Sequence, residues 1–205
     1  MSDLPPRVFL LSPARAGGER IGLLLSPKAN FALALEFQQK GAPIGALFEF
    51  ASGLYFRGKL AYARAFGRAP AGGPSALAIV PGRGLMDVEQ PITTAELRAI
   101  GEVPVDPSDA RYREPLERDA RLLARRLGKD GVAVLLGSIA TGKYADLFLE
   151  ALGEQLLFPP SFVGRGDMSR GGLLLRAVHA KEELPYAPLR GAIRHGARPP
   201  RLKPY

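Results

Sequence analysis

The sequence contains no cysteine and only two histidines, His179 and His195, among its 205 residues. Without cysteine the chain has no disulfides, no thiolate nucleophile and no thiolate metal ligand. Two histidines also argue against a zinc site built on imidazole ligands. We therefore expect neither a metal nor a cofactor.

Long apolar runs are absent too. No stretch reaches the 18 residues that suggest a membrane span, so we expect no membrane association. Residues 1–15 lack the charged segment that opens a signal peptide, and their short apolar run ends at Ser12-Pro13. This pattern predicts a first strand and a cytoplasmic protein.

The composition, 46% hydrophobic and 23% charged, is typical of a globular protein with a substantial core. Short apolar runs at 7–11, 76–80 and 132–136 predict buried strands. Between them, segments with apolar residues at helical spacing predict helices. The predicted helices cover residues 29–39, 43–51, 54–66 and 94–100, the last of them capped by Thr93. A further, long helix is predicted to open at 107–109 and to end near Leu127.

The last part of the chain is expected to contain a loop over Ser161–Gly172 and a strand over Leu173–Val178, with Glu183–Tyr186 paired beside that strand. The fold class is therefore α/β: a single layered domain with a mainly parallel central sheet flanked by helices, and antiparallel additions near the C-terminus. We assign residues 1–188 to this domain. Residues 189–205 form a basic segment rich in proline and arginine, without regular structure.

Positive charge is concentrated at the end of the chain. Residues 165–205 carry nine lysines and arginines against three acids, six of the net +8 charges. A basic terminal segment suits a polyanionic partner such as nucleic acid. A general compositional bias toward arginine and proline explains it as well.

Residues 132–152 predict a buried strand, a glycine turn and a helix that opens near Lys143. This arrangement presents backbone N–H groups to an anion. The turn matches the phosphate-loop pattern G-x-x-x-x-G-K-[ST] at Gly137, Gly142 and Lys143, but Tyr144 stands where the magnesium-binding hydroxyl belongs. The glycines are equally consistent with close packing of strand and helix.

Two further segments combine aromatic or acidic residues with cations. On the helix 54–66, Tyr55 lies on an aromatic face, with Arg57, Lys59 and Arg64 on the other side. Tyrosines among cations can stack on a nucleotide, although packing on a sheet also explains them. In the glycine-rich loop, Asp167 is the only acid and stands between Arg165 and Arg170. It is a candidate acid for base-directed chemistry, or a partner of a neighbouring arginine.

Several short patterns resemble the YaaA-like family, the peroxide-stress proteins and their short bacterial relatives. They are a first strand with a polar loop, the helix 54–63 (LYFRGKLAYA), a strand running into Gly84-Leu85, the apolar strand and glycine turn of 132–144, and Gly164–Gly166. The first loop departs from the family, with Ser12 and Arg15 in place of a cysteine and paired lysines. The resemblance implies an α/β fold, DNA association and kinship with glycosylase-like folds that handle extruded bases.

Together these observations predict a protein that binds nucleic acid or a nucleotide, and they leave open whether it also carries base-directed, glycosylase-like chemistry. The alternatives are a DNA-binding stress protein without catalysis and a phosphate-loop-like nucleotide-binding protein. The predicted catalytic residues are Asp167 and Tyr144. The predicted ligand or phosphate contacts are Ser12, Arg15, Tyr55, Arg57, Arg83, Gly137, Ser138, Thr141, Gly142, Lys143, Arg165 and Arg170. The predicted nucleic-acid surface consists of Arg190, Arg194 and Arg198.

Overall fold

The fold is built on a central strand, β1 (Arg7–Leu11), in a computed structural model that describes residues 4–200 and 202. β1 pairs in parallel with β3 (Ala76–Val80) on one side and with β6 (Val132–Leu136) on the other. The six-stranded sheet has the order β4-β3-β1-β6-β7-β8. The edge strands are β4 (Gly84–Asp87), antiparallel to β3, and β8 (Ala187–Pro188), antiparallel to β7 (Leu156–Phe158).

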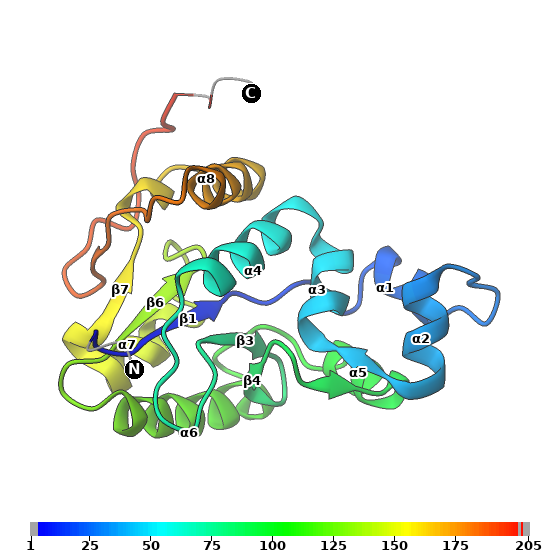
Figure 1. The fold of residues 1–205 in the computed structure, drawn as a ribbon. Coiled ribbons are helices and arrows are strands. Elements are labelled where there is room, and N and C mark those ends of the chain that lie inside the picture. The colour runs from blue at the N-terminus through cyan, green and yellow to red at the C-terminus, as the bar shows by residue number, and fades with distance from the viewer. Residues whose placement is uncertain (1–3, 201, 203–205) are drawn as a thin grey trace.

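Helices cover both faces of the sheet (Figure 1). One face carries α4 (Leu54–Phe66) and α8 (Asp167–Ala180), and the other carries α6 (Ala110–Leu127) and α7 (Ala145–Leu152). Side chains of β1 alternate between these layers, as the period of two in a strand requires. Phe9 and Leu11 belong to the core with α4 and α8, whereas Val8 and Leu10 belong to the core with α6 and α7.

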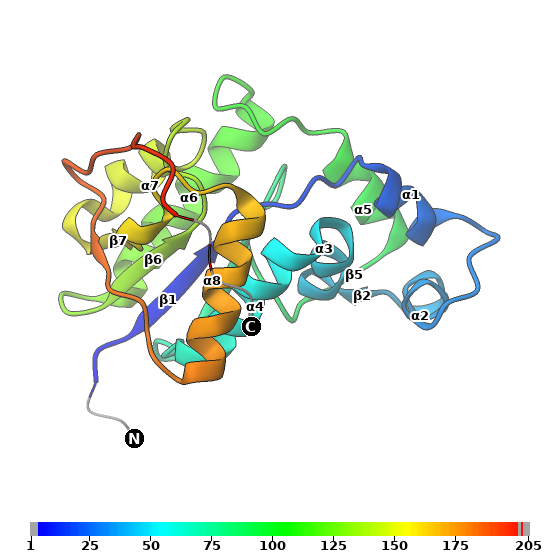
Figure 2. The ribbon, with the colours of Figure 1, turned by 90° about the horizontal axis from the view of Figure 1, so that it is seen from above.

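A smaller cluster of elements extends beyond the carboxyl end of β1, as the view from above shows (Figure 2). It contains short helices and a two-stranded ribbon. The elements are α1 (Glu19–Leu25), α2 (Ala32–Lys40), β2 (Ala42–Pro43), α3 (Ile44–Ser52), β5 (Pro91–Ile92) and α5 (Thr94–Gly101).

The predicted fold class is confirmed: the sheet is mostly parallel, helices pack on it, and an antiparallel pair lies near the C-terminus. The three predicted buried strands and the helix α4 have the bounds expected. Thr93 caps α5 with a capping box, in which its hydroxyl accepts from the N–H of Glu96 and the Glu96 carboxylate accepts from the N–H of Thr93.

The prediction for residues 161–178 is wrong. The segment contains a short 3₁₀ turn (Pro160–Phe162) and then α8, so Leu173–Val178 is helical and Glu183–Tyr186 forms no strand. The run LLLRAV is apolar enough for a strand, but Leu174 and Ala177 are the buried members, which is helical spacing. The antiparallel addition is instead β7 with β8.

The basic terminal segment follows β8 and has no helix or strand in its described residues, 189–200 and 202. Leu189 is buried and its N–H donates to the carbonyl of Leu156, at 2.8 Å. Farther on, the segment passes over the loop around Gly164, whose missing side chain leaves room for the carbonyl of Ala197. The remaining positions, 201 and 203–205, lie outside the described residues.

Candidate functional site

The carboxyl ends of β1 and β6 form a switch point in the sheet. After β1 the chain passes through α4 on one face of the sheet and returns in the neighbouring strand β3. After β6 it passes through α7 on the opposite face and returns in β7, on the other side of the sheet. Such divergence opens the crevice in which open α/β sheets bind ligands. Ser12 and Gly137 are the first residues beyond the two strands, and the N–H of Ser12 donates to the carbonyl of Leu136 at 3.2 Å.

Gly137 is a glycine because two groups approach its Cα. A Cβ at this position would lie 2.8 Å from the Cβ of Ser12 and 2.8 Å from the hydroxyl of Tyr144. No side chain fits in that space. The absence of a side chain at Gly137 therefore lets Ser12, which follows β1, and Tyr144, which precedes α7, meet at the end of β6.

Lys59 reaches this point from α4. Its ammonium donates to the carbonyl of Ser12 at 2.6 Å and to the Ser12 hydroxyl at 2.8 Å. The nitrogen lies 4.4 Å from the centre of the Tyr55 ring and 4.6 Å from that of Phe56. Lys59 is only 1% exposed, so two aromatic rings and one serine replace water around its charge.

This burial lowers the pKa of Lys59 from 10.5 to about 7. Desolvation of the ammonium is the main cause, Arg170 adds to it, and Asp167 opposes it. A substantial fraction of the side chain is therefore the neutral amine at neutral pH, which is both a base and a nucleophile.

Two buried tyrosines complete the polar cluster. The Tyr144 hydroxyl has the Ser12 side chain and the backbone of Ser138 as hydrogen-bond partners. The Tyr55 hydroxyl is buried without a hydrogen bond of good geometry among the described residues, and the charged group that acts on it most is Arg170. Burial raises the pKa of both tyrosines, so both stay protonated at neutral pH.

α8 contributes Asp167 and Arg170, which are brought close to α4 by a pair of glycines. A Cβ on Gly58 would lie 2.7 Å from the carbonyl of Gly171, and a Cβ on Gly171 would lie 2.8 Å from the carbonyl of Leu54. The two helices therefore touch backbone to backbone. This contact brings the last helix of the chain to the site.

Arg170 is largely buried, and Asp167 is largely exposed. The Arg170 guanidinium donates to the carbonyl of Phe162 at 3.2 Å and to the carboxylate of Asp167 at 3.3 Å. Only 10% of the Arg170 side chain is exposed, against 69% for Asp167. Asp167 thus has the neighbouring-arginine partner that the sequence allowed, and its catalytic role stays a prediction.

A cavity of about 160 Å³ borders this cluster at the end of β6. Arg170, Arg194 and His195 contribute its cationic or titratable groups. The remaining lining residues are small or apolar and come from the turn after β6 and from the segments around Gly164 and Gly196. They are Ile139, Ala140, Phe162, Val163, Gly164 and Gly196.

The glycine turn of the phosphate-loop pattern holds a carboxylate close by. α7 begins at Ala145, two residues later than predicted. Gly142 has a positive φ of 65°, and a Cβ there would lie 2.1 Å from the Asp146 carboxylate, which pairs with Arg194. Lys143 acts electrostatically on Asp106, ahead of α6. Phosphate binding by Lys143 stays a prediction. The N-terminus of α7 already has a negative charge beside it, the carboxylate of Asp146.

The structure brings together only some of the predicted residues. Ser12, Tyr55, Gly137, Ser138, Tyr144, Asp167 and Arg170 lie in the cluster at the strand ends. Others lie apart from it or already have partners. Arg57 lines a separate groove near α3. Arg83 pairs with Glu96, Arg190 pairs with Glu154, and Arg165 donates to the carbonyl of Ser161 and the hydroxyl of Ser169. The remaining predicted contacts are exposed: Arg15, Thr141, Lys143 and Arg198.

Lys59 was not among the predicted site residues and was expected on the side of α4 away from the aromatic face, which is wrong because it is buried beside Tyr55 and Phe56. The helical period could have predicted its burial, because Lys59 follows Tyr55 by four residues and precedes Tyr62 by three, which places the three side chains on one face of the helix. All three are buried on one face. A lysine at i+4 in an aromatic stripe indicates a buried amine.

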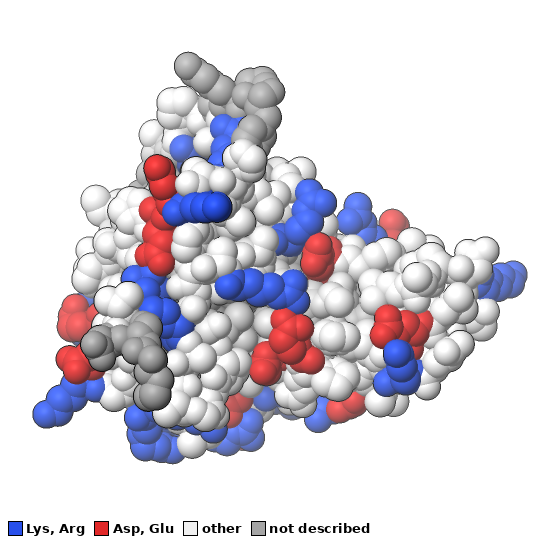
Figure 3. Space-filling model, viewed as in Figure 1, with Lys and Arg blue, Asp and Glu red and all other residues white. Residues whose placement is uncertain are grey.

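Charges of both signs are interspersed over the face of the molecule drawn in Figure 3. Several arginines pair with acids, including Arg64 of α4 with Glu89 and Arg190 of the terminal segment with Glu154. Part of the positive charge of the chain is thus engaged in ion pairs. Among the described residues, no group of three or more histidines and acids could hold a metal ion.

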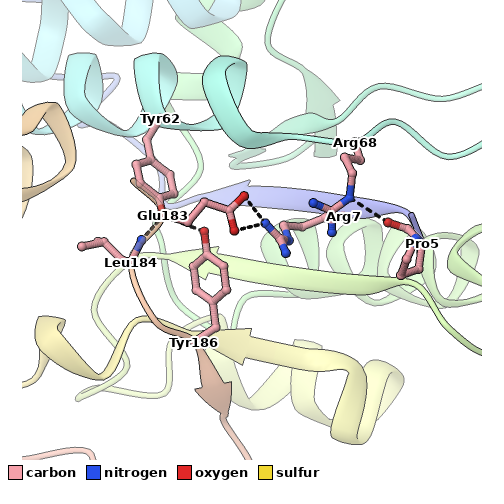
Figure 4. A network of polar contacts seen from close by, with 7 residues as sticks. All are labelled: Pro5, Arg7, Tyr62, Arg68, Glu183, Leu184 and Tyr186. Carbon is pink, nitrogen blue, oxygen red and sulfur yellow. Dashed lines mark hydrogen bonds and ion pairs between the residues drawn. The ribbon is translucent and has the colours of Figure 1, made fainter. Parts of the chain in front are cut away.

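A second polar network lies at the opposite, amino end of β1 (Figure 4). The hydroxyls of Tyr62 and Tyr186 share a hydrogen bond of 2.6 Å, and Tyr62 also accepts from the N–H of Leu184 at 2.8 Å. Glu183 pairs with Arg7. This network fastens the segment after α8 to α4 and to the start of β1.

Comparisons with known proteins do not add a relative. No protein-family model, no curated protein and no solved structure matches the chain. Within residues 4–200 and 202, no helix is both long and apolar enough to cross a bilayer.

Proposed function

We propose that the protein binds a phosphate-bearing ligand, a nucleic acid or a nucleotide, in the cavity lined by Arg170, Arg194 and His195. The observation that carries this proposal is the meeting of two arginines and a histidine in one cavity at the switch point of the sheet. Guanidinium groups match phosphate oxygens in geometry and charge.

The surroundings of the cavity support the same ligand class. Arg190 and Arg198 belong to the same terminal segment as Arg194, so a chain of phosphates entering the cavity would meet further positive charge. The resemblance to the YaaA-like family agrees with DNA as the ligand.

Both lining arginines have carboxylate partners that a phosphate would have to replace or share. The Asp146 partner of Arg194 and the Asp167 partner of Arg170 are each more than half exposed. Each carboxylate can turn into water when a phosphate takes its place, so the exchange leaves neither the acid nor the arginine buried without a partner.

The test is binding of labelled single-stranded DNA, double-stranded DNA and a labelled nucleoside triphosphate, followed by fluorescence anisotropy from about 50 to 200 mM salt. Arg194→Gln should weaken binding about tenfold, the value of one charge-assisted contact. Arg121→Gln, a surface change on α6, is the control and should leave affinity unchanged. Absence of binding to all three probes at the lowest salt would contradict the proposal.

Arg190→Gln distinguishes the two kinds of ligand. Arg190 has the same setting as Arg194, a terminal-segment arginine paired with an acid, but it does not line the cavity. A nucleotide confined to the cavity should be insensitive to this change. A nucleic acid that follows the terminal segment should bind more weakly and lose part of its salt dependence.

A further inference from the structure

The buried contact between Ser12 and Lys59 has the geometry of a nucleophile with its base. The Ser12 hydroxyl and the Lys59 amine are 2.8 Å apart, within the range that proton transfer requires. A third group orients the base: the carbonyl of Ser12, 2.6 Å away, fixes the Lys59 nitrogen from one side. The Tyr55 and Phe56 rings enclose it on others.

We propose that Ser12 is a nucleophile activated by Lys59, and that the protein cleaves an ester or amide bond by acyl transfer. Serine with lysine as its base is one of the recognised variants of the catalytic triad. Ser12 stands at the carboxyl end of a central parallel strand, where such folds present reactive groups. Tyr144 is a further hydrogen-bond partner of the Ser12 side chain.

The reaction balances with water as the only co-substrate. The neutral Lys59 amine takes the proton of the Ser12 hydroxyl as the oxygen attacks the carbonyl carbon of the substrate. The resulting ammonium gives that proton to the departing alkoxide or amine, and the acyl group remains on Ser12. Water, deprotonated by the same amine, then attacks the acyl carbon and releases the acid, and Ser12 recovers its proton.

The groups around Lys59 fit this cycle. Burial favours the neutral amine between turnovers, and Arg170 supports it, while Asp167 favours the ammonium formed during attack. Tyr55 and Tyr144 are protonated and add no charge at neutral pH. Arg170 is also the permanent cation nearest to this cluster on α8, and its positive charge stabilises the oxyanion that forms on the substrate.

A purely structural role explains the contact less well. A clamp between α4 and β1 needs only the carbonyl of Ser12, and an apolar side chain would pack there without the cost of burying an ammonium. Both hydrogen bonds that Lys59 makes within the described chain go instead to Ser12, one of them to its hydroxyl. The cavity shares Arg170 with this cluster, so a substrate bound in the cavity would lie beside the cluster, and in this respect the inference rests on the proposed function.

The experiment is covalent labelling of the full chain with an uncharged fluorophosphonate and with a small sulfonyl fluoride, followed by mass spectrometry of the modified peptide. We expect one label, on Ser12, that Ser12→Ala abolishes. Lys59→Met should slow labelling by about 100-fold or more, the usual value of a general base. Ser108→Ala, an exposed serine near α6, is the control and should label like the native chain.

The pH profile separates catalysis from structure. The labelling rate should rise through about pH 7, where Lys59 loses its proton, and then level off. Circular dichroism of each variant verifies folding, and Ser12→Ala keeps the carbonyl that holds Lys59. Failure of both reagents to label Ser12, or labelling that Lys59→Met leaves unchanged, overturns the inference. Because both reagents are uncharged, that failure is distinct from a failure to bind phosphate.

Discussion

Lys59 carries an amine into the contact between α4 and the end of β1, where water is excluded. Its burial matters for proton transfer, because a lysine with a pKa of about 7 can gain and lose a proton under physiological conditions. The same burial makes this residue a cost to folding whenever it is charged.

Lys59 should make stability depend on pH with a defined sign. The pKa is lowered in the folded chain, so between about pH 7 and 10 the unfolded chain binds one more proton. The penalty is complete below about pH 7 and is relieved as pH rises, which gives a slope of up to about 1.4 kcal/mol per unit. Urea unfolding of the native chain and Lys59→Met, from about pH 6.5 to 9.5, measures the difference.

Because the native chain and Lys59→Met share all their other titratable groups, the contributions of those groups cancel in the difference between the two unfolding free energies. The free energy of unfolding of the native chain, relative to Lys59→Met, should therefore rise over this range. Parallel curves would show that Lys59 titrates as an ordinary exposed lysine. In that case Lys59 would be an ammonium at neutral pH and could not act as the base that activates Ser12.

At the scale of elements, the crossing of α4 and α8 decides whether the site exists. Gly58 and Gly171 let the helices meet at their backbones. The contact lies directly beside Tyr55 and one residue from Arg170. Any increase in the separation of the helices would withdraw Arg170 from the cluster.

A single methyl group should disturb this crossing. Gly58→Ala places a Cβ 2.7 Å from the carbonyl of Gly171, and neither backbone can yield without moving a helix. We expect a loss of about 1–3 kcal/mol in the free energy of unfolding. Gly22→Ala on α1 is the matched control, since no atom lies within 4 Å of its Cβ, and it should be neutral or stabilising. Equal effects of the two substitutions would exclude a tight crossing.

The same crossing explains which elements could be predicted from the sequence. α4 and α6 present helical periodicity within their own residues, and the three central strands are short apolar runs, so local pattern is sufficient for them. α8 contains Gly171 and Gly172 and a run of three leucines, a local pattern typical of a loop and a strand. Its helical state depends on α4, which is more than 100 residues away in the chain.

The site was predictable only in part for a similar reason. Ser12, Gly137 and Tyr144 follow strand ends or stand in a glycine-containing turn, and Arg170 directly precedes Gly171 and Gly172, so the sequence indicates close approach at each of them. Lys59 has no such marker apart from its spacing to Tyr55. Which arginines line a cavity and which pair with acids depends on the path of the terminal segment, and no local pattern determines that path.

For the whole molecule, the segment between α8 and β8 connects the end of the chain to its beginning. It fastens to α4 through Tyr62 and to β1 through the pair of Arg7 with Glu183 (Figure 4). The guanidinium carbon of Arg7 also lies 5.2 Å from the centre of the Tyr186 ring. The sheet is therefore closed at one end by this network, while its other end carries the candidate site.

Removal of one hydroxyl should loosen that connection. Tyr186→Phe deletes the 2.6 Å hydrogen bond with Tyr62 and should cost about 1 kcal/mol of unfolding free energy. Tyr112→Phe on α6 is the control, because its buried hydroxyl has no hydrogen-bond partner among the described residues. Its loss should be neutral or stabilising. Chemical denaturation of the two variants compares them directly, and a larger loss in the control would argue against a stabilising network.

The crossing of the glycine-bearing helices also has a consequence for the order of events during synthesis. During synthesis α4 leaves the ribosome well before α8, because 100 residues separate Phe66 from Asp167. Until α8 emerges, the face of α4 at Gly58 lacks the backbone of Gly171 that packs against it. The site at the strand ends therefore gains Asp167 and Arg170 only after a long further stretch of chain has been made.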